Sequence, residues 1–70
     1  MPRFFIKPEQ KKQNEIEIIG EDVKHIKNVL RKHIRDKIEI CNSETGKVYK
    51  CEIIQINEEI IKTRILEELE

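Results

Sequence analysis

The chain has 70 residues, enough for one small domain but not for two, because neither half could bury a usable core. Charged residues make up 40% of the sequence, and 14 Lys and Arg residues balance 14 Asp and Glu residues. The longest apolar runs are two or three residues, which excludes a transmembrane helix of about 20 apolar residues and a secretory signal, so the cytoplasm is the expected compartment.

The first third of the chain predicts two strands separated by a polar loop. The aromatic and β-branched run at residues 3–7 favours a strand, in which both Phe4 and Phe5 are expected to face the core. Residues 9–14, "EQKKQN", contain no apolar residue and predict a solvated loop. In residues 15–20, "EIEIIG", isoleucines alternate with glutamates, which is the pattern of a half-buried strand.

The stretch "VKHIKNVLRKHIR", residues 23–35, predicts a helix about 20 Å long at ~1.5 Å per residue. Its apolar residues recur at helical spacing and would form one stripe, made of Val23, Ile26, Val29, Leu30 and Ile34. The opposite face is basic, without an intervening acid, and carries Lys24, Lys27, Arg31 and Arg35. Such a face is either simply solvated or in contact with a polyanion. A membrane-surface helix would usually add Trp or Phe to the apolar side, and this one has neither.

Three further strands are predicted after the helix, in "DKIEIC", "KVYKCEIIQI" and "EIIKTRIL". Turns at "NSETG" and "NEE" would join them into an antiparallel meander. In the second of these strands one face would hold Tyr49, Cys51 and Ile53, and the other Val48, Ile54 and Ile56. The predicted fold is therefore mainly β. It is a small curled sheet or barrel of five or six strands, with the helix closing one end.

The sequence contains no complete active site. Cys41 and Cys51 are too few for a disulfide framework and lack metal-ligand spacing, so we expect two reduced, half-buried thiols. His25 and His33 are eight residues apart, which does not suit a shared metal, and we expect phosphate contacts or packing from them. Two glycines cannot build a phosphate-binding loop. The chain alone is therefore expected to hold no metal and no cofactor, and to catalyse nothing.

The charges are divided unevenly along the chain. Residues 1–37 hold ten Lys and Arg against six Asp and Glu, a balance of +4, and residues 38–70 have a balance of −4. Because partner choice depends on the local field, the zero total does not exclude RNA. The acidic end "LEELE" keeps a protein-interaction module open as an alternative.

Several segments together resemble one family over nearly the whole chain. They are "MPRFF" at residues 1–5, "GEDVKHIKNVLR" at residues 20–31, "DKIEIC" at residues 36–41, and a following hairpin ending in "KCEI". The family's His-Leu-x-x-Val-Leu-Arg motif corresponds to "HIKNVLR" at residues 25–31. The sequence is thus similar to the N-terminal PUA-like domain of the small-subunit (16S) ribosomal RNA uracil-N3 methyltransferases, the RsmE family.

The resemblance implies a PUA-like barrel that holds small-subunit ribosomal RNA in a bacterial, homodimeric parent enzyme dependent on S-adenosylmethionine. Family members continue into a knotted SPOUT domain that binds this cofactor, and residues 1–70 do not include it. The chain is therefore expected to be a single RNA-binding domain, or fragment, without membrane contact. The residues expected to contact RNA are Arg3, Lys24, His25, Lys27, Arg31 and Arg35. A stand-alone protein-interaction or general RNA-binding module is the alternative.

The chain departs from the family pattern just after the predicted helix. The family usually has Pro-Gly-Asp where this chain has Ile34-Arg35-Asp36. An arginine at the glycine position is expected to need a different turn, so that the helix would end later or less sharply. The family also often has His-His where this chain has Lys24-His25.

Overall fold

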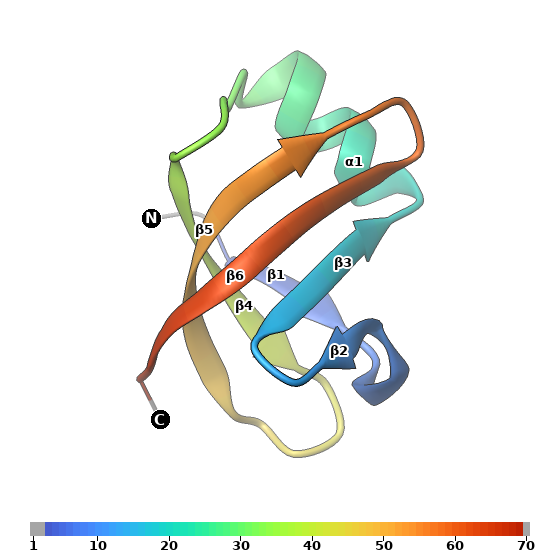
Figure 1. Cartoon of the computed structure of the whole chain (residues 1–70). Helices are drawn as coiled ribbons and strands as arrows, with labels where there is room; N and C mark the ends of the chain where they lie inside the picture. Colours follow the sequence, from blue (N-terminus) through green and yellow to red (C-terminus); the bar gives the residue numbers. More distant parts are fainter. Residues whose placement is uncertain (1–2, 70) are drawn as a thin grey trace.

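The structure, a computed structural model, describes residues 3–69. Within them, six strands form one mixed sheet in the order β1-β4-β5-β6-β3-β2, which curves into a half-barrel (Figure 1). The strands are β1 Arg3–Ile6, β2 Lys11–Lys12, β3 Glu15–Ile19, β4 Lys37–Asn42, β5 Val48–Ile56 and β6 Ile60–Glu68. The predicted class, mainly β with one helix across one end, is confirmed.

The centre of the sheet is the predicted meander of β4, β5 and β6, whose neighbours all pair antiparallel. The two strands that were predicted in the first third of the chain, β1 and β3, join it from either side. β1 lies parallel to β4, with Phe4 opposite Ile40, and β3 lies antiparallel to β6, with Ile16 opposite Thr63. Segments far apart in the sequence therefore form the two flanks of the half-barrel.

The polar segment after β1 is more ordered than the predicted loop. Pro8–Gln10 form a 3-10 turn, and Lys11–Lys12 form β2, which pairs with β3. The side chain of Gln10 fixes this turn, because its Oε1 accepts a hydrogen bond from the Lys7 N–H at 3.1 Å and its Nε2 donates to the Glu17 carbonyl at 2.9 Å. The loop prediction for residues 9–14 is therefore wrong at residues 9–12.

The core consists mostly of isoleucine, which suits strands because a β-branched side chain packs well on a pleated surface. Ile16 and Ile18 on β3 are fully buried, as their alternation predicted. Phe4 is also buried, but the neighbouring Phe5 is 62% exposed, because successive residues of a strand point to opposite faces. The expectation that both phenylalanines face the core is therefore wrong for Phe5.

A bulge in β5 changes which residues share a face. The register with β6 shifts between Ile53 and Gln55, so that Ile54 is an extra residue without an opposite partner. This shift returns Ile56 to the core side, opposite the buried Ile61, although simple alternation placed it on the other face from Ile53. Ile56 is half-buried and packs against the core.

The helix is shorter than predicted. It begins as α1, Glu21–Lys24, and continues as a wider π-helical segment, His25–Val29. The Leu30 N–H donates to the His25 carbonyl and the Lys32 N–H to the Ile26 carbonyl, both at 3.0 Å. Arg31 then adopts a left-handed backbone with φ of 54°, which is the usual way for a helix to end. The prediction of one helix through residue 35 is therefore wrong.

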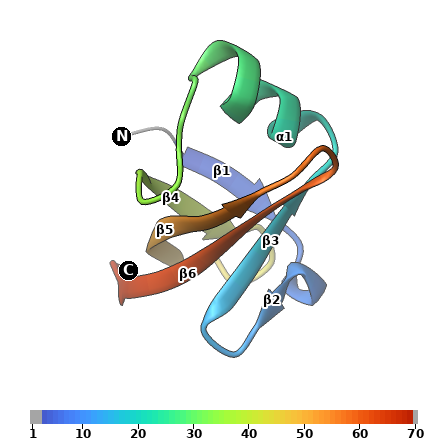
Figure 2. The ribbon, with the colours of Figure 1, turned by 45° about the horizontal axis from the view of Figure 1, so that its top comes forward.

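The early end of the helix also divides the predicted apolar stripe. Val23 and Ile26 are buried against the sheet, as predicted. Leu30 is only partly buried, and Val29 and Ile34 are 65% and 55% exposed. Figures 1 and 2 both place the helix across one end of the curved sheet, near the turn between β5 and β6. The first two turns of the helix therefore close the core, and the rest of the stretch runs over the surface.

Arg35 keeps the backbone of a glycine although it carries a side chain. Its φ is 81°, in the left-handed region. The loop is held there by two hydrogen bonds to β5, one from the Arg35 N–H to the Ile53 carbonyl at 2.7 Å and one from the Ile53 N–H to the Asp36 carbonyl at 2.9 Å. The expectation that the helix would end later is wrong, because the chain keeps the sharp turn and accepts backbone strain at Arg35.

We expect Arg35→Gly to raise the free energy of unfolding by about 0.5–1 kcal/mol, because glycine adopts a positive φ without steric strain. In a domain of this size, each kcal/mol moves the thermal midpoint by about 4–8 °C. Arg35→Ala is the matched control, since it removes the exposed guanidinium but keeps the Cβ. A glycine variant no more stable than the alanine variant in thermal unfolding would show that the backbone is not strained.

Candidate nucleic-acid interface

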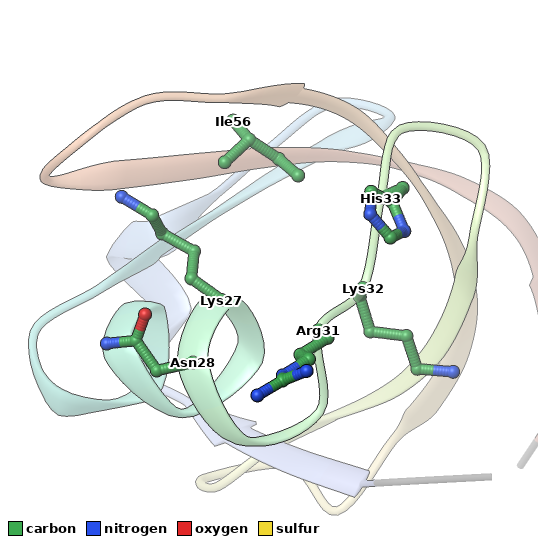
Figure 3. A pocket seen from close by; sticks show the side chains of 6 residues that line it. All are labelled: Lys27, Asn28, Arg31, Lys32, His33 and Ile56. Atoms are coloured by element: carbon green, nitrogen blue, oxygen red, sulfur yellow. The ribbon is translucent and has the colours of Figure 1, made fainter.

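An open hollow of about 510 Å³ lies between the end of the helix, the loop that follows and the end of β5. We call it the basic hollow. Figure 3 shows the side chains that line it, which are Lys27, Asn28, Arg31, Lys32, His33 and Ile56. Two come from the helix, three from the loop and one from the sheet. Because three segments meet here, the hollow depends on the fold as a whole.

The local backbone explains why these side chains gather. The left-handed turn at Arg31 stops the helix, so that residues 31–33 line the hollow instead of continuing along a rod. Lys27 lies along the other side, where its Nζ donates to the Asn57 carbonyl at 3.5 Å. Ile56 forms an apolar wall that is held in place by the core.

The lining of the basic hollow carries positive charge and contains no acidic side chain. Lys27, Arg31 and Lys32 line it together with no carboxylate. None of the ion pairs within residues 3–69 includes any of these three cations. Those pairs join Arg3 to Glu39, His33 to Asp36, Lys47 to Glu68 and Arg64 to Glu52. Lys and Arg side chains without an acidic partner are suited to neutralising phosphates, and Figure 3 shows the charged ends of these three spread around the hollow, each toward a different side.

The structure brings together only some of the residues predicted to contact RNA. Lys27 and Arg31 share the basic hollow. Lys24 and His25 line a neighbouring hollow that also contains Glu21, and the His25 ring packs edge-on against Phe4 with centroids 6.1 Å apart.

The two remaining predicted residues lie elsewhere. The Arg3 Nη2 is 3.0 Å from the Glu39 Oε1, in an ion pair across β1 and β4. Arg35 lines a third hollow, together with Glu52 and Arg64. The acidic residues beside Arg3 and Arg35 weaken the positive field there. Of the predicted residues, Lys27 and Arg31 are therefore the best placed to contact RNA.

Four residues that line the basic hollow were outside the predicted set of RNA contacts, namely Asn28, Lys32, His33 and Ile56, although a phosphate contact or packing was expected of His33. In a continuous helix Lys32 and His33 would point in different directions from Lys27. The hollow exists only because the helix ends before these two residues. The positive φ at Arg31 is the reason, and Arg carries no signal for it, whereas Gly or Asn would. The run of three basic residues at 31–33 was the available hint.

Residues 3–69 include no group of three or more His, Cys, Asp or Glu side chains arranged to hold a metal ion. Over the same residues, no helix has the length and apolar character needed to span a membrane.

Comparison with known proteins identifies the class. Residues 18–66 match the family model for the PUA domain of RNA methyltransferases. Because this match covers well over half of the chain, the chain belongs to that family. The resemblance predicted from the sequence is therefore confirmed. No protein of curated function matches the chain.

Several solved structures share the fold of this chain. One, described only as a hypothetical protein, has a TM-score of 0.83 and 29% identity over 94% of this chain and 28% of its own. A predicted RNA methyltransferase from Thermotoga maritima has a TM-score of 0.83 and 17% identity, over 99% of this chain and 30% of its own. The ribosomal RNA small subunit methyltransferase E of Neisseria gonorrhoeae, bound to S-adenosyl methionine, has a TM-score of 0.76 and 22% identity, over 99% and 28%. This chain thus spans less than a third of each of these proteins.

Proposed function

We propose that this chain is the RNA-binding domain of an S-adenosylmethionine-dependent methyltransferase that acts on N3 of a uridine in small-subunit ribosomal RNA. The match to the PUA domain of RNA methyltransferases carries this proposal. The likeness to a small-subunit methyltransferase bound to its cofactor supports the substrate and the cofactor. In this proposal the partner is small-subunit ribosomal RNA, and the parent enzyme acts in the cytoplasm of a bacterium.

The reaction itself belongs to another part of the parent enzyme in this proposal. The matched structures are more than three times as long as this chain, which leaves room for a C-terminal SPOUT domain that binds S-adenosylmethionine. Residues 1–70 then form a single domain that holds the RNA, and the parent acts as a homodimer. Within this division of labour, the basic hollow is the surface that meets RNA phosphates.

The salt dependence of RNA binding tests the proposal. Three phosphate contacts, on Lys27, Arg31 and Lys32, predict a slope of log affinity against log salt near −2, at about 0.7 per contact on single strands. We expect Arg31→Gln to make this slope shallower by about 0.7, because one contact is lost. The measurement is fluorescence anisotropy of a labelled fragment of small-subunit ribosomal RNA over a series of salt concentrations.

Lys12→Gln is the matched control, because it removes the same charge from an exposed residue of β2, which Figure 1 shows at the end of the sheet opposite the helix. Glutamine at residue 31 has a Cβ as arginine does, so Arg31→Gln should not change the backbone strain there. If both variants shift the slope equally, the RNA contact is a general charge effect and the basic hollow is not the site. If neither binds less RNA than the parent does, the protein-interaction alternative gains support.

A further inference from the structure

The basic hollow differs from the neighbouring hollows in what it combines. Each of the four others described within residues 3–69 has at least one glutamate in its lining. The basic hollow has none, and beside its three cations it has the apolar side chain of Ile56 and the imidazole ring of His33. Its lining therefore suits a ligand that is anionic on one side and flat and weakly polar on the other.

The wall of the basic hollow formed by Ile56 and the loop at His33 is held in place. Ile56 packs against the core, opposite the buried Ile61 of β6. The loop at His33 is fixed by Asp36, whose Oδ2 accepts a hydrogen bond from the His33 N–H at 2.7 Å, and whose own N–H donates to the His33 carbonyl at 3.0 Å. The His33 side chain is 84% exposed, so a face of its ring remains free to stack. The Ile56 side chain and the backbone at His33 are therefore fixed before a partner binds, and only the exposed His33 ring has to settle on it.

The shape of the basic hollow decides which form of RNA fits. A duplex keeps its bases stacked inside and offers mainly phosphates and sugars to a protein, whereas a single strand can turn a base outward onto a side chain. A volume of about 510 Å³ is within the range of sites that take small ligands, but this hollow is open along its side, so a chain can enter and leave it.

The geometry points to a binding site for one unpaired RNA nucleotide, with its phosphates on Lys27, Arg31 and Lys32 and its base against His33 and Ile56. This inference rests on the proposed function and names the part of the RNA that the site takes. The base is held by stacking and apolar contact, so the site accepts any base and supplies affinity without reading sequence. His33 is the residue that separates such a site from a plain phosphate-binding patch.

The test compares two oligomers of equal charge on this chain, hexauridylate and a hexamer of the same backbone without bases, by fluorescence anisotropy at low salt. We expect hexauridylate to bind about 5–10-fold more tightly, the lower part of the range for a base stacked on an aromatic side chain. His33→Ala should reduce this preference to nearly none. His33→Phe should retain it, because the ring remains although the ionisable nitrogens are gone. Thermal unfolding should be unchanged in the alanine variant, because the side chain is exposed.

The outcomes separate the inference from the function on which it rests. Equal binding of the two oligomers by the parent chain, or a preference that survives in His33→Ala, would overturn the single-nucleotide site and leave RNA binding in place. A preference lost in both His33→Ala and His33→Phe would also overturn it, because the ring would then not be what the base contacts. Failure of the chain to bind either oligomer at low salt would contradict the proposed function itself.

Discussion

Replacing Ile26 with alanine is expected to lower the free energy of unfolding by about 2–5 kcal/mol, which is the usual effect of truncating a buried isoleucine side chain to alanine. Ile26 is fully buried and, with Val23, attaches the helix to the sheet. A domain of this size has only about 5–10 kcal/mol of stability, so the variant should unfold at a much lower urea concentration than the parent chain. Circular dichroism during urea unfolding measures the change.

Two neighbouring residues provide matched controls for Ile26. Val29 is 65% exposed, so Val29→Ala should change stability by no more than about 0.5 kcal/mol. Leu30 is partly buried against the core, and Leu30→Ala should have an intermediate effect. If Val29→Ala destabilised the chain as much as Ile26→Ala, the helix would be docked through a different face than the structure shows.

The second large effect is expected at alkaline pH. Cys51 lies in the middle of β5, opposite Ile38 on one side and Ile65 on the other, and is fully buried where half-burial was expected. This burial raises the pKa of its thiol from 9.0 to about 11, against a smaller lowering by the hydrogen bond with Thr63. The folded chain therefore keeps the thiol neutral at a pH where the unfolded chain releases the proton.

The sign of the pH dependence follows from this difference. The stability that the neutral thiol contributes is fully present below pH 9.0 and is lost as the pH rises through about 11. Because each pKa unit corresponds to about 1.4 kcal/mol, the total loss is about 2–3 kcal/mol. Urea unfolding at pH 8 and at pH 11 measures it, as the difference between the parent chain and Cys51→Ala. All other residues are the same in the two proteins, so the difference isolates Cys51, and an equal pH dependence in both would contradict the assignment to Cys51.

The strands could be predicted well because their signal is local. Alternating isoleucines at residues 16 and 18, and again at 38 and 40, indicate directly which face is buried, and the structure buries all four. The turns around Gly46 and Asn57 separate the strands of the meander, where residue preferences of tight turns are strong. Pairing between strands distant in the sequence was not predicted in detail, since no local pattern encodes it.

The errors have a different cause, which is that tertiary contacts override local preference. The stretch after Leu30 has good helical spacing, but hydrogen bonds from the Arg35 loop to β5 compete with the helix and end it. That single change replaces a long basic face with the basic hollow, so two of its residues could not be found from periodicity. Gln10 similarly orders a segment that composition alone marks as loop.

The open ends of the sheet have a consequence for aggregation. A half-barrel leaves two edge strands, and an unpaired edge can pair with the strand of another molecule. At one edge, β2 has only two residues, and both are lysines, which repel a second copy and carry strongly hydrated groups. At the other edge, β1 is four residues long and is followed by Pro8, which cannot donate a ladder hydrogen bond. Short, charged and proline-limited edges thus oppose the pairing of this open sheet with a second copy.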